Sequence, residues 1–426
     1  EKEGISGLTV DSTKTIALEI GKCLHSYARR KRYDSHAFVG STLIYVYGKC
    51  GDIFNAEKVF CDLVVRGVVS WNVMMCGYVH HGHSLHALSF FAKMNQEGAE
   101  PNKATYLYLL QACGDSGGIL EGNMLHAHIV ESATVVDVII GSSLIDMYTK
   151  CGGLEDAHEV FCRLSKRNVI SWSAIIRGYA YHGHHLHALE LFERMKEEDI
   201  QPDKVTFLCA LKAIGNLRMM IQGTLIHDSV ILIGLESDVM IGNGLMHMYC
   251  SCGSFESACK VFDNMPNRDV VSWSALMDGY AQMGEAEKVI EKFNKMMIEV
   301  VIPDVVTFLV LLTACNHAGL LEEGLMVFDA MDSSYAVTPT LDHYTCMVDF
   351  LVRVGHFDKA LDVIENVSPS HWLPLLLTLL GACCCNCMNV DLARWAFEQL
   401  LQLDKECVSA YVCMGNIYAS AEMQTR

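Results

Sequence analysis

Apolar residues recur along this chain at the spacing of an amphipathic helix, in segments that come in pairs. In residues 169–203 the apolar positions are Trp172, Ile175, Ile176 and Tyr179, followed by Ala188, Leu191, Phe192 and Met195. Each set has the i, i+3, i+4, i+7 spacing that places its members on one face of a helix. Gly183 separates the two sets, and Pro202 cannot continue the second helix. Asp203 then stands where the next helix needs an N-cap, so the pattern predicts one helix–turn–helix hairpin.

The same pattern returns at a fixed distance along the chain. Trp71, Trp172 and Trp273 are 101 residues apart, and prolines follow the same interval. Each interval divides into units of 35, 31 and 35 residues, and each unit is expected to form two helices. The predicted units are 2–36, 37–67, 68–102, 103–137, 138–168, 169–203, 204–238, 239–269, 270–304, 305–340 and 341–372, which together form the array 1–372, followed by helical repeats in 373–426 of which the second is incomplete.

A single hairpin of this length cannot bury its own apolar face, so neighbouring hairpins must stack. The predicted fold is therefore all-α: an α-solenoid superhelix of stacked helix–turn–helix repeats. The three recurring tryptophans lie on the apolar faces, and we expect them to pack between adjacent hairpins rather than to stack on a base. Stacking also accounts for the positive mean hydropathy of +0.23.

Composition narrows the class of protein further. Hydrophobic residues make up 51% of the chain and charged residues 19%, which excludes a disordered chain. The longest apolar run, residues 373–385, is too short for a membrane-spanning helix. The 19 cysteines are spread through a helix-patterned chain without a signal peptide, so reduced intracellular thiols are expected. The chain begins without Met or a transit-like segment, and we expect a fragment or a mature form.

The alternating unit lengths differ from the constant length of about 34 residues in tetratricopeptide repeats. The three unit types are "KVTFLCALKAIGNLRMMIQGTLIHDSVILIGLESD" at 204–238, "VIIGSSLIDMYTKCGGLEDAHEVFCRLSKRN" at 138–168 and "VISWSAIIRGYAYHGHHLHALELFERMKEEDIQPD" at 169–203. In these motifs the chain resembles plant pentatricopeptide-repeat proteins of the PLS subclass, with long, short and P-type repeats. Residues 341–367 look like the closing short repeat of this subclass, and residues 379–420 are similar to the E region that follows it. The chain ends before any DYW deaminase domain.

The resemblance implies single-stranded RNA bound along the concave groove, about one repeat per base. Two side chains of each repeat then meet the Watson–Crick edge: one early on the first helix, and one that closes the repeat. The pairs at these positions are Asn72 with Asn102, Ser142 with Asn168, Ser173 with Asp203, Asn243 with Asp269, and Ser274 with Asp304. The family's code implies, in this order, a pyrimidine, adenine, guanine, uracil and guanine. The implied core footprint is 5′-Y-x-A-G-x-U-G-3′.

The sequence contains an internal control for the early position. It is polar in the short and P-type units but is Leu107, Leu208 or Leu309 in the later long units. A polar residue there is therefore not a general requirement of the solenoid. The closing aspartates have a second interpretation, because Asp137 and Asp238 close long units with an early leucine and serve equally well as N-caps.

Two units depart from the family's pattern, and they limit the footprint. Ser41 is paired with Gly67, which has no side chain to reach a base. Thr345 is paired with Trp372, where the family usually has an aspartate or asparagine. Neither end of the footprint is therefore assigned a base.

Histidines and cysteines offer alternative chemistry. The histidine-rich stretches 79–86 and 181–187 fall at turns between helices, which are normally solvated. Cys384-x-x-Cys387 is half of a possible zinc site, but the chain contains no second C-x-x-C and no His-x-Glu. Cys50, Cys151 and Cys252 recur at the hairpin turn and are interpreted as small structural residues. We therefore expect no catalytic residue, no metal and no cofactor.

The leading hypothesis is a sequence-specific RNA-binding protein of a mitochondrion or chloroplast, with no membrane segment. It would act as a specificity factor for C-to-U RNA editing and recruit a DYW-type deaminase or other editing factors in trans through residues 373–426. The net charge of −18 opposes this hypothesis, because nucleic-acid binders usually carry a basic surface. That charge favours a second hypothesis, a protein-interaction scaffold. The third is a fragment of a longer enzyme with its own deaminase domain.

Overall fold

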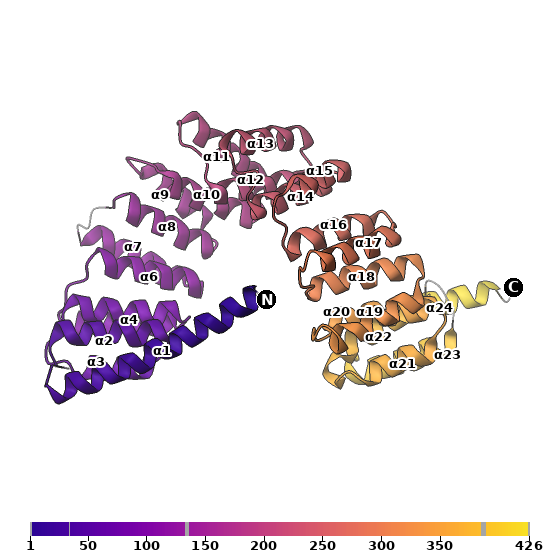
Figure 1. The fold of residues 1–426 in the computed structure, drawn as a ribbon, viewed down its shortest axis with the longest axis horizontal. Coiled ribbons are helices and arrows are strands. Elements are labelled where there is room, and N and C mark those ends of the chain that lie inside the picture. The colour runs from indigo at the N-terminus through magenta and orange to yellow at the C-terminus, as the bar shows by residue number, and fades with distance from the viewer. Residues whose placement is uncertain (1, 34, 133–135, 385–388, 425–426) are drawn as a thin grey trace. The chain divides into compact units, whose positions relative to one another are not determined.

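A computed structural model describes the backbone of residues 2–33, 35–132, 136–384 and 389–424. Of these, residues 14–419 are also described with their side chains. Within these ranges all regular secondary structure is helical (Figure 1), which confirms the all-α prediction. The chain divides into two compact units, Glu1–Leu217 and Arg218–Arg426. Each unit is described in turn.

The first unit stacks hairpins side by side. Its helices are α1 (Lys2–Arg30), α2 (Ala37–Cys50), α3 (Ile53–Asp62), α4 (Val68–His80), α5 (Ser84–Gln96), α6 (Lys103–Ser116), α7 (Ile119–Glu131), α8 (Val138–Lys150), α9 (Leu154–Arg163), α10 (Val169–Tyr181), α11 (His185–Glu197) and α12 (Lys204–Leu217). The first helices of successive hairpins contact one another in the order α2, α4, α6, α8, α10 and α12. The second helices α3, α5, α7, α9 and α11 each pack on the first helix of their own hairpin. This unit is therefore a solenoid segment with two layers of helices.

The second unit repeats this arrangement. Its helices are α13 (Met220–Ile233), α14 (Val239–Ser251), α15 (Phe255–Asn264), α16 (Val270–Gln282), α17 (Ala286–Ile298), α18 (Val305–Ala318), α19 (Leu321–Ser333), α20 (Leu341–Arg353), α21 (Phe357–Glu365), the short 3₁₀ helix η1 (Pro369–His371), α22 (Trp372–Ala382), α23 (Val390–Leu403) and α24 (Val408–Gln424). First helices contact one another in the order α14, α16, α18, α20, α22 and α24, and α13 packs on α14. The α-solenoid prediction therefore holds within each unit.

A glycine in the left-handed backbone region sets the turn within a hairpin. Gly117, which ends α6, has φ of 68°, a conformation that strains a residue with a Cβ atom. The first predicted unit has Ile16 and Ala17 where this later unit has Gly117 and Gly118, and α1 runs through as one helix. The prediction of two helices in residues 2–36 was therefore wrong. That unit lacks the residue that would end its first helix.

The recurring tryptophans are buried between neighbouring hairpins, as predicted. Trp71, Trp172 and Trp273 are each at most 1% exposed. The ring of Trp172 meets the ring of Phe161, from the preceding hairpin, edge to face at 4.7 Å, and the other two tryptophans make the equivalent contact. Among the described residues, no hydrogen-bond partner reaches any of the three indole N–H groups. Burial at this depth excludes stacking of these rings on a nucleobase.

Three arginines at the same interval, Arg66, Arg167 and Arg268, join adjacent hairpins. Arg167 donates through Nε to the carbonyl oxygen of Phe161 (3.2 Å) and through a terminal nitrogen to that of Cys162 (3.3 Å), at the end of α9. Its guanidinium lies 4.9 Å from the centroid of the Phe161 ring. The remaining nitrogen donates to Glu198, just after α11, at 3.2 Å. One side chain therefore caps a helix and ties it to the next hairpin.

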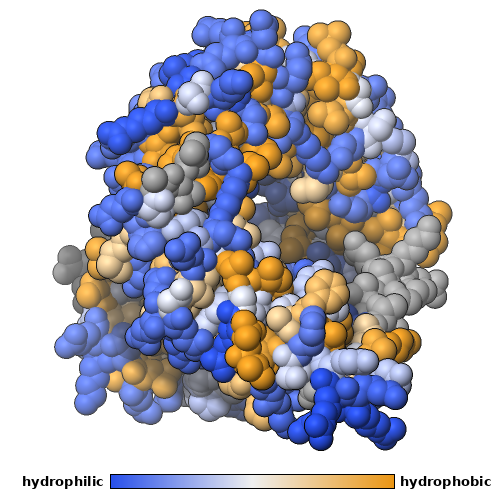
Figure 2. Space-filling view, turned by 90° about the vertical axis from the view of Figure 1, so that its left-hand side faces the viewer, coloured by the Kyte–Doolittle hydropathy of each residue, from blue (hydrophilic) through white to orange (hydrophobic). Residues whose placement is uncertain are grey.

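Apolar side chains occupy the surface as well as the interior. Figure 2 shows hydrophobic side chains in orange among hydrophilic ones in blue on one face of the molecule. Phe38, Leu232 and Ile298 are 78%, 86% and 80% exposed. The interior between hairpins therefore accounts for only part of the positive mean hydropathy. In the described part of the chain, no helix is both long and apolar enough to span a bilayer.

Candidate nucleic-acid interface

The five residues predicted to close repeats all cap a first helix. A side-chain oxygen of each accepts the backbone N–H three residues further on, at 2.9–3.2 Å, in Asn102, Asn168, Asp203, Asp269 and Asp304. Such a bond satisfies one of the amide groups that a helix leaves without a partner at its start. The capping interpretation of the closing residues is therefore correct.

Capping also brings the closing residue to the early residue of the same repeat. Oδ1 of the closing residue accepts a hydrogen bond from the early side chain in the pairs Asn72–Asn102 (3.0 Å), Ser173–Asp203 (3.0 Å) and Asn243–Asp269 (3.1 Å). The second terminal atom of each of these closing side chains makes no hydrogen bond within the described residues. One oxygen thus serves the scaffold, and the other terminal atom is left for a further partner.

The other two pairs are arranged differently. The hydroxyl of Ser274 lies 2.9 Å from Oγ1 of Thr307, which in turn donates to Oδ1 of Asp304 at 2.9 Å. Ser274 is therefore joined to Asp304 through a hydroxyl. Ser142 instead donates to the carbonyl oxygen of Val138 at 2.6 Å, and it shares a cavity with Asn168.

A third polar residue, missed in the sequence analysis, completes these sites. Buried hydroxyls stand three residues after the closing residues, at Thr105, Ser171, Thr206, Ser272 and Thr307. The hydroxyl of Thr105 donates to Oδ1 of Asn72 at 2.6 Å, and that of Ser272 donates to Oδ1 of Asn243 at 2.6 Å. The sequence signal was the recurring Asn/Asp-x-x-Ser/Thr spacing of a capping box. The hydroxyls of Thr105 and Ser272 therefore fix how the Asn72 and Asn243 side chains are turned.

Hydrogen bonds keep the carboxylate of Asp269 ionised. Burial alone would raise the pKa of Asp269, but the amide N–H of Ser272, the side chain of Asn243 and the Ser272 hydroxyl donate to the carboxylate and hold the pKa below its ordinary value. An ionised carboxylate accepts hydrogen bonds and cannot donate them, whereas an asparagine side chain does both. The aspartate and asparagine sites therefore offer different chemistry to a neighbouring group.

Exposed apolar side chains lie beside the polar pairs, and these were also missed. The residue three positions before the early residue is apolar and exposed in eight units: Phe38, Val69, Ile139, Ile170, Val205, Met240, Val271 and Val306. In the P-type units it stands two residues before the buried tryptophan, off the stripe that packs into the core. The sequence signal that could have predicted these exposed side chains was an apolar residue that recurs in these units outside the stripe that packs into the core.

Two of the polar pairs line one cavity of about 540 Å³ in the first unit. Its walls include Ser142, Asn168, Ser173 and Asp203, together with Leu107, Ile139, Ile170 and Val205. The cavity thus combines hydrogen-bonding groups with exposed apolar surface, as sites for flat polar ligands do. The early leucine of a long unit faces the same space as the serines.

The two departing units lack a closing side chain of this kind. Gly67 caps α4 without a side-chain hydrogen bond. Trp372 is the first residue of α22, and its indole N–H donates to the carbonyl oxygen of Val367 at 2.9 Å. Neither residue presents a free polar atom next to its early partner, so the footprint ends stay unassigned.

The histidines and cysteines take structural places. The ring of His86 stacks on Tyr78 at 5.8 Å, and that of His187 stacks on Tyr179 at 5.7 Å. Over the described ranges, no three His, Cys, Asp or Glu side chains come together as metal ligands. The described cysteines other than Cys383 and Cys413 have free thiols, while Cys387 of the C-x-x-C lies outside the described residues.

Comparison with known proteins places the repeats in one family. Residues 66–115, 167–216 and 268–317 match the PPR repeat family, and residues 41–68, 142–169, 243–270, 306–335 and 342–366 match the PPR repeat. These matches cover more than half of the chain and return at the 101-residue interval. The chain belongs to the pentatricopeptide-repeat (PPR) family.

Relatives in Arabidopsis thaliana align with nearly the whole chain. The pentatricopeptide repeat-containing proteins At1g11290, chloroplastic, At3g13770, mitochondrial, and CRR2, chloroplastic, are 34%, 36% and 35% identical over 95%, 95% and 94% of this chain. The chain spans only 50%, 65% and 62% of these relatives. The crystal structure of the PPR protein PPR10 in complex with an 18-nt psaJ RNA element matches 91% of this chain and 61% of that one, with a TM-score of 0.74 and 16% identity. This match shows that the PPR fold is shared.

Proposed function

We propose that this chain binds single-stranded RNA sequence-specifically and that the early and closing side chains read the bases. The observation that carries the proposal is the unused terminal atom of Asn102, Asp203 and Asp269, held beside a polar early side chain by helix capping. The PPR10 complex supports it, because a protein of the same fold is in complex with an 18-nt psaJ RNA element. RNA would lie with its 5′ end toward the N-terminus of the chain.

The closing residue would select bases by their hydrogen-bond donors. An aspartate only accepts, so it matches uracil and guanine, whose Watson–Crick edges carry a ring N–H. An asparagine also donates, so it suits the ring acceptor of adenine or cytosine. This chemistry agrees with guanine at Asp203, uracil at Asp269 and adenine at Asn168.

The early residue would select bases by size. Serine is short and leaves room for a purine, whereas asparagine reaches further and favours the smaller pyrimidine. Ser142, Ser173 and Ser274 would therefore read purines, and Asn72 and Asn243 pyrimidines. In chain order the proposed footprint is 5′-Y-x-A-G-x-U-G-3′, with no base assigned to the long units.

The exposed apolar side chains would hold the base faces. Ile139 and Ile170 flank the cavity that contains Ser142 and Asn168. A base placed between two such side chains buries apolar surface on both faces, which gives affinity for any sequence. The polar pair would then add discrimination at the base edge.

In the cell, we propose a mitochondrial or chloroplast factor that specifies sites of C-to-U RNA editing. The relatives At1g11290 and CRR2, which are named as chloroplastic, and At3g13770, which is named as mitochondrial, support the location. The resemblance of residues 379–420 to an E region supports recruitment of a DYW-type deaminase in trans through residues 373–426. In this role the chain binds and positions RNA, and the chemistry belongs to its partner.

Asn243→Thr tests the proposed base reading. The shorter threonine keeps a hydroxyl beside Asp269 and leaves room for a purine, so the preferred base at this position should change from uracil to guanine. One wrong base typically costs about 1–3 kcal/mol, or roughly 5- to 150-fold in Kd. Fluorescence anisotropy with four RNAs that differ only at this base measures the change.

The matched control is Asn264→Thr, the same substitution at an exposed residue at the end of α15. It should leave the uracil preference intact. An unchanged preference in Asn243→Thr would contradict the assigned code at this repeat. Absence of RNA binding by the unsubstituted chain would contradict the proposed function and favour the scaffold that the net charge of −18 suggests.

A further inference from the structure

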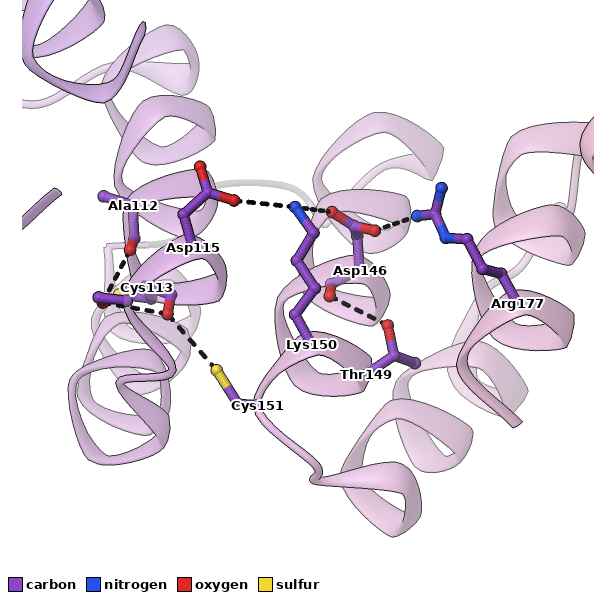
Figure 3. A network of polar contacts seen from close by, with 9 residues as sticks. Ala112, Cys113, Asp115, Asp146, Thr149, Lys150, Cys151 and Arg177 are labelled. Atoms are coloured by element: carbon purple, nitrogen blue, oxygen red, sulfur yellow. Dashed lines mark hydrogen bonds and ion pairs between the residues drawn. The ribbon is translucent and has the colours of Figure 1, made fainter. Parts of the chain in front are cut away.

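Four charged side chains in the first unit form a continuous series of ion pairs, here called the ion-pair chain (Figure 3). Nζ of Lys150 lies 3.0 Å from a carboxylate oxygen of Asp115 and 3.1 Å from one of Asp146. The other carboxylate oxygen of Asp146 pairs with the guanidinium of Arg177. Asp115 belongs to α6, Asp146 and Lys150 to α8, and Arg177 to α10. The ion-pair chain therefore crosses three successive first helices.

Three members of the ion-pair chain face the proposed RNA site. Asp146, Lys150 and Arg177 line the same cavity of about 540 Å³ as Ser142 and Ser173. Asp146 follows Ser142 by four residues, and Arg177 follows Ser173 by four, which places each about 6 Å further along the same helix face. A strand whose bases reach the serines would carry its phosphates near these cations.

The charged groups are accessible to such a strand. The side chains of Asp146, Lys150 and Arg177 are 28%, 40% and 48% exposed. Phosphate oxygens and the Asp146 carboxylate are the same kind of hydrogen-bond acceptor for both cations. RNA phosphates must therefore compete with Asp146 for Lys150 and Arg177.

The scaffold itself does not require the ion-pair chain. The equivalents of Asp146, Lys150 and Arg177 one interval earlier are Tyr45, Lys49 and Cys76, and one interval later they are His247, Ser251 and Asp278. The helix that carries Asp146 and the helix that carries Arg177 are in contact, and so are their equivalents, α2 with α4 and α14 with α16. The charges are thus a local property of this part of the groove.

We infer that Asp146 withholds Lys150 and Arg177 from RNA phosphates and thereby limits how tightly this part of the chain binds RNA. The inference rests on the proposed function, because it assumes RNA in this cavity. Since the competition concerns the sugar–phosphate backbone, Asp146 sets affinity and salt dependence without choosing a base. Asp146 is thus one acidic residue, in a chain of net charge −18, that weakens RNA binding at the site itself.

The test is a salt titration of RNA binding by Asp146→Asn and by Asp115→Asn/Asp146→Asn. The single substitution frees Arg177, while Lys150 keeps Asp115; the double substitution frees both cations. Each new phosphate contact should steepen the slope of log K against log salt by about 0.7 on single-stranded RNA. Between roughly 50 and 200 mM salt, the gain in affinity should therefore fall about 2.6-fold for the single variant and about sevenfold for the double variant.

Glu193→Gln is the matched control, because it removes one negative charge and the ion pair with Lys196 on α11, away from the cavity. Anisotropy is measured on the footprint RNA and on a scrambled RNA of equal length. Equal tightening on both RNAs, with the steeper slopes above and no such change in Glu193→Gln, supports the inference. Slopes equal to that of Glu193→Gln, or tightening on the footprint RNA alone, overturn it while the proposed function stands. Failure of the unsubstituted chain and the variants alike to bind either RNA overturns both.

Discussion

The arginine between hairpins gives the sharpest test of how this solenoid is held together. Arg167→Ala removes two hydrogen bonds to carbonyl oxygens of α9, the contact with the Phe161 ring and the ion pair with Glu198. Within the described residues, the Phe161 carbonyl oxygen then keeps only the N–H of Leu164, at 3.4 Å, and that of Cys162 depends on water for a partner. We expect the free energy of unfolding to fall because one residue supplied both the helix cap and the link between hairpins.

The magnitude follows from the individual contacts. Buried hydrogen bonds from a charged donor contribute roughly 1.5–3 kcal/mol each, and the 19% exposure of the Arg167 side chain reduces this to about 1 kcal/mol each. The stacking on Phe161 adds about 0.5–1 kcal/mol. The ion pair is worth at most about 0.5 kcal/mol, since Glu198 is 33% exposed. The expected loss is therefore about 2.5–3.5 kcal/mol.

Thermal unfolding of the full chain, followed by circular dichroism, measures this loss. For a unit of the size of Glu1–Leu217, a loss of about 2.5–3.5 kcal/mol lowers the Tm of its transition by roughly 5–14 °C. Arg163→Ala is the control: Arg163 lies on the same helix, is 76% exposed and pairs only with Glu159 among the described residues. Arg167→Lys should recover less than half of the loss, because an ammonium group cannot replace the planar fork. Equal Tm values for Arg167→Ala and Arg163→Ala would refute the reasoning.

Three further predictions concern the core and the proposed site. Trp172→Ala should cost about 3–5 kcal/mol, whereas Trp172→Phe should cost clearly less because the lost indole N–H has no partner among the described residues; denaturant titration compares them. Asp203→Asn should keep the helix cap and change the preferred base from guanine to adenine. Asp203→Ala should lower the Tm and also remove the preference for one base over another at this repeat. The pKa of Asp269 is lowered in the folded chain, so its contribution to stability is present above the ordinary carboxyl pKa of about 4 and is lost as the pH falls through the folded value. The difference in Tm between the unsubstituted chain and Asp269→Asn should therefore shrink between pH 7 and pH 3, and a constant difference would contradict this assignment.

Periodicity was sufficient to predict the fold because each unit repeats the same solution to burying one apolar face. The positions of Trp172 and Phe161 follow directly from the stripe and the 101-residue interval. The first unit could not be predicted in this way, because its length matched the interval while Ile16 and Ala17 replaced the glycines of the turn. A single backbone conformation, rather than hydrophobic patterning, decides whether two helices or one form there.

The proposed site was only partly predictable, because its geometry depends on contacts between residues about 30 apart. The pairs could be named from the resemblance, but the hydroxyl of Thr105 that orients Asn72 is 33 residues away in sequence and belongs to another hairpin. The ion-pair chain could not be predicted from the sequence either, since Asp146 of α8 pairs with Arg177 of the neighbouring first helix, α10. Such contacts follow from the stacking of hairpins and appear only once the stacking is known.

Helix capping explains why the closing residues are drawn from so few types. The closing residue must accept an amide N–H of the next first helix and still present a second polar atom beside the early residue. Asparagine and aspartate satisfy both demands, because each carries two terminal polar atoms on a short side chain. A serine or threonine can cap, but its single oxygen is then held at the helix amide, and it has no second terminal atom to present beside the early residue. Asparagine and aspartate differ in whether the second atom can donate a hydrogen bond or only accept one. Under the proposed function, this difference distinguishes bases with a ring N–H from bases without it.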